Sequence, residues 1–353
     1  MSTVSRRAEG RDTERFDALV FIGRFQPFHR AHLHVLRQAL ARAARVVVLI
    51  GSTERPRTIR DPFTYEERRD MIRACLTPQE APRVLIEALQ DSLYNDAVWS
   101  RWVQSAVGQA LGRVDGLQIG LIGHEKDATS YYLRMFPQWR RLDAEVDDEL
   151  SATEVRNHLF AERASGFLGW ATPEPVHAWL ERFRLQPVFA ELKAEAAFLD
   201  HYRRAWTNTP HPVIFVTVDA VVVHSGHLLL VRRRAAPGRG LWALPGGFLD
   251  PEERVEAGCL RELREETGLK LPEPVLRGSL RDRQVFDHPG RSLRGRTLSH
   301  AFLFHFATGE LPRVKGGDDA DKARWFALHE FSTMRALMFE DHYDIAQHFI
   351  GKL

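Results

Sequence analysis

The first half of the chain alternates apolar runs of strand length with amphipathic stretches of helical length. The apolar runs are ALVFIG at 18–23, VVVLIG at 46–51, VLIEAL at 84–89 and LQIGLIG at 117–123; the helical patterns lie near 31–43, 64–76 and 95–111. Strands that alternate with helices predict an α/β, doubly wound parallel sheet of the Rossmann-like kind. Ligands of such sheets bind beyond the carboxyl ends of the strands.

The second half follows a different pattern. VIFVTVDAVVVH and HLLLVRRR predict two strands that turn at Ser225–Gly226. A Gly/Pro-rich loop, an acidic helix, two further strands (TLSHAFLFHFAT and ARWFAL) and a closing helix near 340–350 follow. This order predicts an α+β domain. We therefore expect domains at 17–186 and 213–353, joined by a helical connector and linker at 187–212 that ends in TNTPHP.

Composition limits the number of domains, the kinds of partner and the compartment that we expect for the protein. Its 353 residues suit two domains, and 44% hydrophobic with 27% charged residues is ordinary for a globular protein. The net charge of +2 gives no reason to expect a nucleic-acid partner, and no apolar run is long enough for a membrane span or signal peptide. With only Cys75 and Cys259, which lack metal-type spacing, we expect a cytoplasmic protein. The oligomeric state, including a homo-oligomer, stays open.

An acidic stretch, GFLDPEERVEAGCLRELREETGL, raises the first chemical question. Glu262, Glu265 and Glu266 fall on one helical face, where their carboxylates repel each other. One interpretation is a solvated charged face; the other is a site completed by a divalent cation, since Mg²⁺ prefers carboxylate and phosphate oxygens. The neighbouring stripe of Cys259, Leu260 and Leu263 predicts that the same helix anchors in a core.

The stretch resembles the Nudix box, G-x5-E-x7-R-E-U-x-E-E-x-G-U, in which U is aliphatic. Every specified position matches: Gly247, Glu253, Arg261, Glu262, Leu263, Glu265, Glu266, Gly268 and Leu269. The resemblance implies hydrolysis of a nucleoside diphosphate linked to another group, with Glu262, Glu265 and Glu266 as ligands of Mg²⁺ (or Mn²⁺) and Glu265 among the catalytic residues. Metal ions neutralise a pyrophosphate and lower the pKa of a bound water.

The general base and the substrate are less determined by the sequence. Asp318, Asp319 and Glu340 are candidate bases outside the box. The segment RDRQVFDHPGRSLRGRTLSHAFLF is similar to Nudix domains that act on ADP-ribose and accompany NAD metabolism. Its arginines are candidates for binding phosphates or ribose: Arg281, Arg283, Arg291, Arg294 and Arg296. NADH and related dinucleotides remain alternative substrates.

A second cluster, GRFQPFHRAH at 23–32, follows the first predicted strand and leads into a helix. A helix amino terminus offers free N–H groups and a positive dipole to phosphates. His29 and His32 are three residues apart, so both can lie on one side of the first turn. The candidate binding residues around them are Gly23, Arg24, Phe25 and Gln26.

This cluster resembles the HxGH nucleotidylyltransferase superfamily, above all the archaeal-type nicotinamide mononucleotide (NMN) adenylyltransferases, which also occur fused to a Nudix domain. Ala31 replaces the usual glycine of the motif. YNDAVW resembles the segment in which an aromatic stacks on nicotinamide and an amide reads its carboxamide, roles that fall to Trp99 and Asn95. GHEKDATSYYLRMFPQW matches a GHxKD segment at His124, Lys126 and Asp127.

The last matching segment is LSATEVR, which resembles an ISxTxxR signature. There the resemblance implies that Ser151 and Thr153 cap a helix over the ATP phosphates and that Arg156 holds them. Taken alone, the segment is also a plain capping sequence. The implied reaction is in-line attack of the NMN phosphate on ATP, with His29, His32 and Arg156 offsetting the growing charge.

The sequence thus indicates a bifunctional enzyme that makes NAD from NMN and ATP and hydrolyses ADP-ribose to AMP and ribose 5-phosphate. One alternative keeps the adenylyltransferase but makes the Nudix half a sensor of ADP-ribose or NAD. Another is a nucleotidylyltransferase for a flavin or pantetheine phosphate, since the superfamily shares the histidine motif. The choice between NMN and its deaminated acid form stays open.

Overall fold

The computed structural model describes residues 15–124, 128–146, 150–161, 166–318 and 320–353. The chain divides into two compact units. The first comprises residues 1–53, 60–91 and 95–189, and the second comprises residues 54–59, 92–94 and 190–353. Most of the stretch that the sequence assigns to a connector therefore groups with the second unit.

The first unit holds a five-stranded sheet in the order β3-β2-β1-β4-β5, and all four pairings are parallel. Its strands are β1 (Phe16–Gly23), β2 (Ala43–Ile50), β3 (Val84–Ala88), β4 (Ile119–Gly123) and β5 (Arg140–Asp143). The doubly wound fold predicted from the alternating pattern is confirmed. The short β5 carries too few apolar residues to be recognised from its sequence, RRLD.

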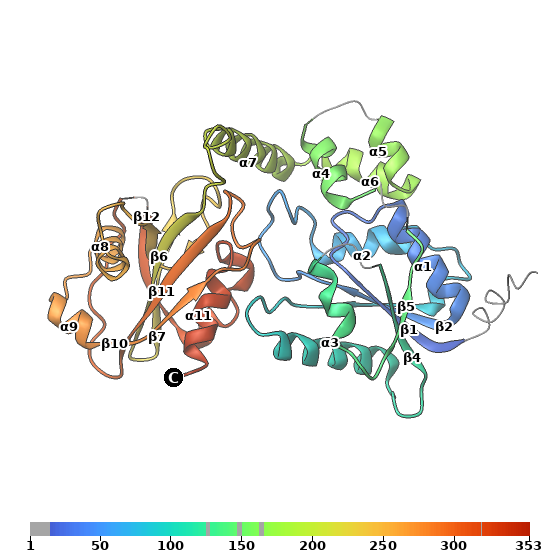
Figure 1. Cartoon of the computed structure of the whole chain (residues 1–353), viewed down its shortest axis with the longest axis horizontal. Helices are drawn as coiled ribbons and strands as arrows, with labels where there is room; N and C mark the ends of the chain where they lie inside the picture. Colours follow the sequence, from blue (N-terminus) through green and yellow to red (C-terminus); the bar gives the residue numbers. More distant parts are fainter. Residues whose placement is uncertain (1–14, 125–127, 147–149, 162–165, 319) are drawn as a thin grey trace, which may run out of the picture. The chain divides into compact units, whose positions relative to one another are not determined.

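Helices cover both faces of this sheet (Figure 1). The helices on the sheet are α1 (Arg30–Arg42), α2 (Tyr65–Ala74) and α3 (Asp96–Leu111). The unit also has α4 (Ala152–Phe160), α5 (Gly166–Ala171) and α6 (Glu174–Phe183), which pack on one another and on α2, and short 3-10 turns at Ala81–Arg83 and Ala128–Arg134. Alternate residues of β1, such as Ala18 and Val20, pack against Val103 and Val107 of α3 in one apolar cluster. Because successive side chains of a strand point to opposite faces, the other side chains of β1 face α1.

The second unit is built on a mixed sheet in the order β10-β11-β6-β7-β12, to which β8 and β9 add short pairings. The strands are β6 (Phe215–His224), β7 (His227–Arg233), β8 (Trp242–Ala243), β9 (Gly246–Phe248), β10 (Leu280–Phe286), β11 (Thr297–Phe306) and β12 (Ala320–Ala327). The central pair, β6 and β11, is parallel; the other pairs are antiparallel. The predicted turn at Ser225–Gly226 joins β6 to β7.

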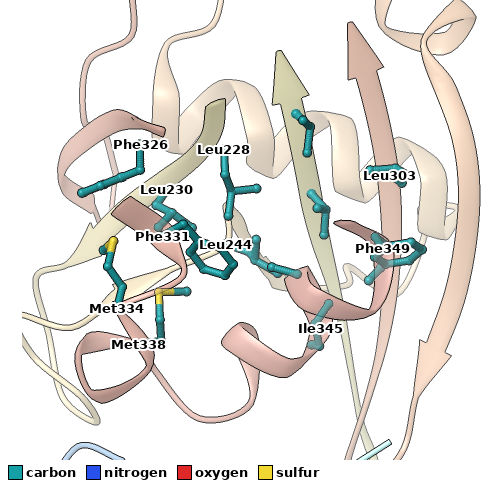
Figure 2. Close-up of a cluster of buried hydrophobic side chains, with 14 of the residues drawn as sticks. Leu228, Leu230, Leu244, Leu303, Phe326, Phe331, Met334, Met338, Ile345 and Phe349 are labelled. Carbon is teal, nitrogen blue, oxygen red and sulfur yellow. The ribbon is translucent and has the colours of Figure 1, made fainter. Parts of the chain in front are cut away.

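Two helices enclose this mixed sheet. On one face, α8 (Val255–Thr267) packs Cys259, Leu260 and Leu263 into an apolar cluster, as the sequence stripe predicts. On the other face, Ile345 and Phe349 of α11 (His342–Ile350) pack into a second cluster, which Figure 2 shows. The remaining helices are α7 (Pro187–Arg204), α9 (Glu273–Gly278), α10 (Leu328–Phe331) and a 3-10 turn at Arg335–Leu337.

Candidate active sites

In the first unit, Gln26 fixes the conformation of the loop after β1. The side-chain amide of Gln26 donates to the carbonyl of Phe63 and accepts from its N–H, both at 3.0 Å. Phe25 has a φ of 52°, and a Cβ at position 23 would lie 2.7 Å from its ring. Gly23 is therefore required for the ring of Phe25 to fold back beneath the loop.

The structure brings the two predicted histidines together at the start of α1. His29 is the N-cap residue, and its ring stacks on that of His32 with centroids 3.6 Å apart. The backbone N–H of His29 donates to Nδ1 of His32 at 3.3 Å. Two imidazoles thus lie beside the positive end of a helix, an arrangement suited to an anionic ligand.

Arg156 brings α4 to the same loop. Its Nη1 donates to the carbonyl of Gln26 at 2.7 Å, and its Nη2 donates to Oγ1 of Thr153 at 3.1 Å. Burial lowers the pKa of Arg156 to about 10, so the guanidinium stays charged at neutral pH. Ser151 caps α4 by accepting from the N–H of Glu154.

A second buried arginine, Arg68 on α2, was not singled out from the sequence. Its Nη1 donates to the carbonyls of Arg24 and Gly51 at 2.7 and 2.6 Å, and its Nη2 donates to that of Ser52 at 3.2 Å. One guanidinium thereby ties together the loops that follow β1 and β2. Burial lowers its pKa to about 10. The available signal was its place on the apolar stripe with Met71 and Ile72.

The two nicotinamide candidates, Asn95 and Trp99, lie at the start of α3. Asn95 is exposed and caps α3, because its Oδ1 accepts from the N–H of Val98 at 3.0 Å. The half-buried Trp99 packs edge-on against Tyr132. His124 follows β4 and is half-buried. Lys126 and Asp127 lie outside the described residues.

In the second unit, the acidic helix α8 ends as its sequence predicts. Gly268 has a φ of 58°, the left-handed conformation favoured at a helix C-cap, and its N–H donates to the carbonyl of Arg264 at 2.8 Å. Glu253 before the helix accepts from the N–H of Asp250 at 3.0 Å. A Cβ at Gly258 would lie 2.7 Å from the Glu253 carboxylate, so that position also requires glycine.

Arg261 organises the carboxylates of this helix. Its Nη2 donates to Glu253 at 2.7 Å, and its Nη1 donates to Glu262 at 2.9 Å and to Glu265 at 3.0 Å. These hydrogen bonds, with Glu253 first, raise the pKa of Arg261. Arg261 therefore pairs with three glutamates, Glu253, Glu262 and Glu265.

Glu262 and Glu266 are the buried acids of the cluster, each 8% exposed. Glu266 accepts from the N–H of Gly246 at 3.0 Å. Desolvation, with a contribution from Glu262, raises the pKa of Glu266 to about 8, and desolvation likewise raises that of Glu262. A Cβ at Gly247 would lie 2.6 Å from a Glu262 oxygen, so glycine lets the backbone approach the carboxylate.

This donor set fits a divalent cation. Two buried carboxylates beside each other cost free energy that a cation would offset, and hard cations take oxygen ligands. Among the described residues no three His, Cys, Asp or Glu side chains are already placed as ligands. Arg261 donates to one oxygen of Glu262 and to one oxygen of Glu265, so a cation could take the second oxygen of each carboxylate.

The three candidate bases differ in their surroundings. Asp318 is exposed, has a φ of 43°, and lies near enough to Glu262 to contribute to that residue's raised pKa. The side chain of Glu340 is 7% exposed and accepts from Oγ of Ser292 at 2.6 Å. Asp319 lies outside the described residues. Asp318 is therefore the described candidate that accompanies the acidic helix.

A buried network unforeseen from the sequence lies on the α11 side of β6. Arg291 donates to both oxygens of Asp341 at 2.9 Å, and Ser299 donates to Asp219. His342 accepts at Nδ1 from the N–H of Leu244 at 3.0 Å. Burial lowers the pKa of His342 to about 3, so its ring is neutral and carries its proton on Nε2.

The five candidate arginines of the second unit separate by position. Arg281 and Arg283 are exposed on β10, Arg291 is buried against Asp341, and Arg296 donates to the carbonyl of Asp287. Arg294 alone of the five lines a cavity of about 190 Å³. Glu266 and His342 line the same cavity, so the acidic helix and the buried network meet there.

Comparison with known proteins agrees with this geometry. Residues 20–157 match the cytidylyltransferase-like family, and residues 214–349 match the NUDIX domain family. A crystal structure of a bifunctional NMN adenylyltransferase/ADP ribose pyrophosphatase from Francisella tularensis, with AMP and Mn ion, covers 96% of this chain and 99% of its own, at 35% identity and a TM-score of 0.89. The chain belongs to this bifunctional family.

Each half of the family also has separate relatives. The nicotinamide/nicotinic acid mononucleotide adenylyltransferase of Acinetobacter baylyi is 36% identical over 180 residues, which are 51% of this chain and 93% of that protein. The ADP-ribose pyrophosphatase of Methanocaldococcus jannaschii is 39% identical over 124 residues, 35% of this chain and 67% of that protein. Within the described residues, no helix is both long and apolar enough to cross a membrane.

Proposed function

We propose that the protein joins ATP and NMN to form NAD and pyrophosphate in its first unit, and hydrolyses ADP-ribose to AMP and ribose 5-phosphate in its second. The observation that carries this proposal is the presence of both sites in one chain that resembles a bifunctional enzyme along nearly its whole length. Both reactions handle an ADP-ribosyl group, which gives the pairing a chemical reason.

The first reaction needs positioning and positive charge rather than a protein nucleophile. The NMN phosphate attacks the α-phosphorus of ATP in line, and pyrophosphate leaves. The stacked pair His29 and His32 lies at the amino terminus of α1, and Arg156 is fixed to the same loop. We assign these three side chains to stabilising the charge that grows on the transferring phosphoryl group.

The remaining residues of the first site have binding roles in this proposal. The loop residues Gly23, Arg24, Phe25 and Gln26, together with Ser151 and Thr153, shape the ATP phosphate site. Trp99 and Asn95 bind the nicotinamide end. His124, Lys126 and Asp127 complete the nucleotide site through their match to the GHxKD segment.

In the second reaction, Glu262, Glu265 and Glu266 would hold Mg²⁺ or Mn²⁺, a charge that would neutralise the pyrophosphate and lower the pKa of a bound water. Glu253 and Arg261 orient those carboxylates through the hydrogen bonds described above. We assign the general base to Asp318, because this exposed carboxylate lies near enough to Glu262 to contribute to its raised pKa. Both cysteines are free, which supports a reducing compartment such as the cytoplasm.

Two variants of the full-length protein test both activities at once. We expect His29→Ala to lower adenylyl transfer by about 10²–10³-fold, the usual effect of removing one stabilising donor, while ADP-ribose hydrolysis is unchanged. Glu266→Gln should lower hydrolysis by more than about 100-fold, beyond the loss typical of residues around a metal's ligands, and leave NAD synthesis intact. Chromatography of NAD and AMP measures both reactions.

Matched controls separate these roles from general damage. His34→Ala alters an exposed histidine on the same helix as His32, and Glu252→Gln alters an exposed acid close to the Nudix helix. Both controls should retain both activities. If wild-type protein binds ADP-ribose tightly but releases no AMP, the second unit is a sensor and the hydrolase assignment is wrong.

A further inference from the structure

The cavity beside the acidic helix has one wall that comes from outside the Nudix sequence pattern. Phe198 and Tyr202 of α7 line it together with Phe248, Arg294 and Glu266. Helix α7 precedes β6, the first strand of the second unit, and its sequence predicts only a connector. Its aromatic side chains have no role in the reactions assigned above.

Specific contacts seat α7 on the second unit. The carboxylate of Glu195 accepts from the N–H of Gly238 in the loop between β7 and β8, and Arg203 donates through Nε and Nη2 to the carbonyl of Leu293 at 3.0 and 2.6 Å. Leu192 and Leu199 are buried, at 4% and 0% exposure. The helix is therefore anchored on both sides of Phe198 and Tyr202.

The two aromatic rings form a continuous apolar surface. Phe198 and Tyr202 are four residues apart on one helical face, and their rings lie nearly parallel with centroids 6.3 Å apart. Phe198 is nevertheless 39% exposed and Phe248 is 38% exposed. Large aromatic side chains that line a cavity and stay exposed offer a surface for a planar, apolar ligand group.

The same cavity also has charged side chains suited to phosphates and a cation. Glu266 belongs to the acidic cluster, and Arg294 lies over the Phe248 ring at 4.9 Å. The cavity thus combines charged groups with aromatic rings. A nucleotide combines the same two chemistries, with phosphates that suit the charged groups and a base that suits the rings.

We propose that Phe198 and Tyr202 of α7 form the base-binding wall of the hydrolase site and stack against the adenine of ADP-ribose. The inference rests on the proposed function, since ADP-ribose contains adenine as its only base. It also places α7 functionally with the second unit. The connector is then part of the active site and a determinant of its specificity for nucleotides.

The double variant Phe198→Ala/Tyr202→Ala tests this wall in the full-length protein. Base–aromatic stacking lost on alanine substitution corresponds to a weakening of about 5- to 100-fold. We expect the KM for ADP-ribose to rise by that factor with little change in kcat, because the carboxylates are untouched. The inhibition constant of AMP should rise in parallel, whereas that of ribose 5-phosphate, which has no base, should stay the same.

Three controls accompany this variant. Tyr202→Phe retains the ring and should behave as wild type. His201→Ala removes an exposed neighbour on the same helix that does not line the cavity, and it should also have no effect. NAD synthesis by the first unit reports on the integrity of the double variant, and it should be unchanged.

Two outcomes would overturn the inference. One is an unaltered KM for ADP-ribose together with unaltered AMP inhibition. The other is an equal loss of AMP and ribose 5-phosphate binding, which would mean that α7 maintains the shape of the cavity rather than binding a base. If wild-type protein fails to hydrolyse ADP-ribose but AMP binding, measured by calorimetry, still depends on both rings, the proposed hydrolysis is wrong and the base-binding wall is supported.

Discussion

The two units carry side chains of opposite charge at the sites that we propose bind phosphates. In the first unit, buried Arg68 and Arg156 bind backbone carbonyls and shape a loop beside two histidines. In the second, buried Glu262 and Glu266 lie next to each other and are held by Arg261 and a backbone N–H. One site is cationic without any added ion; the other is anionic and fits a cation.

The difference shows that the arginines have a different role in each site. A cationic loop can meet an anionic substrate directly, so its arginines are used to fix the backbone. An anionic helix repels the same substrate until a metal ion is bound, so its arginine is used to keep like charges apart. The first unit should therefore lose stability when its arginine is removed, and the second should lose activity.

Arg68→Leu gives the largest expected effect. It removes the donor to four carbonyls, those of Arg24, Gly51, Ser52 and Thr64. Each buried carbonyl left unsatisfied costs about 1–3 kcal/mol, and because water will solvate some of them, the free energy of unfolding of the first unit should fall by about 3 kcal/mol. Urea unfolding followed by tryptophan fluorescence measures this loss. The KM for ATP should rise as the loops separate.

Arg261→Leu is the matched substitution in the second unit. Its guanidinium is partly exposed, and ion pairs of that kind contribute about 0–1 kcal/mol. We expect nearly unchanged stability with a marked loss of ADP-ribose hydrolysis. An equal loss of stability from both substitutions would contradict the comparison.

The next prediction concerns the loss of folding stability at acid pH. Folded His342 has a pKa of about 3 against 6.5 for the ordinary group, so between these values the unfolded chain binds more protons. Stability contributed by neutral His342 is therefore complete above pH 6.5 and falls as the pH drops. Between pH 7 and pH 5 this single group should cost about 2 kcal/mol.

His342→Gln isolates that contribution, because glutamine supplies an acceptor for the N–H of Leu244 but does not titrate. Urea unfolding at pH 7 and pH 5 gives, for wild type and for the variant, the slope of the unfolding free energy against pH. The difference between the two slopes is the contribution of His342. Identical slopes would show that His342 is not held neutral.

The smallest expected effect comes from the end of the acidic helix. Gly268→Ala places a side chain at a φ of 58°, which costs about 1 kcal/mol for a non-glycine residue. Differential scanning calorimetry should show a lower melting temperature for the second unit alone. Gly278→Ala, whose Cβ would meet no atom within 4 Å, is the control.

Local patterns were sufficient for much of this molecule. The order of strands and helices in the first unit, the apolar stripe of α8 and the cap at Gly268 all depend on residues close together in sequence. The two predicted histidines stack because they are three residues apart on a helix. Such features follow from the geometry of one element and need no knowledge of distant partners.

The features that were missed depend on distant partners or on edge position. Arg291 and Asp341 are 50 residues apart, and Arg68 binds carbonyls 16 to 44 residues away. Arg281 and Arg283 are candidates for binding in the sequence, which predicts no strand around them, but 280–286 is β10 at the edge of the sheet. Charged residues on an edge strand discourage pairing with other chains, so Arg281 and Arg283 suit that position.

The central place of β1 in the first sheet has a consequence for synthesis of the protein. β1 pairs with β2 on one side and with β4 on the other. On the ribosome, the second side stays without its neighbour until residues 119–123 have been made. A nascent chain that pauses earlier exposes an apolar strand edge, which is a site for chaperone binding or aggregation.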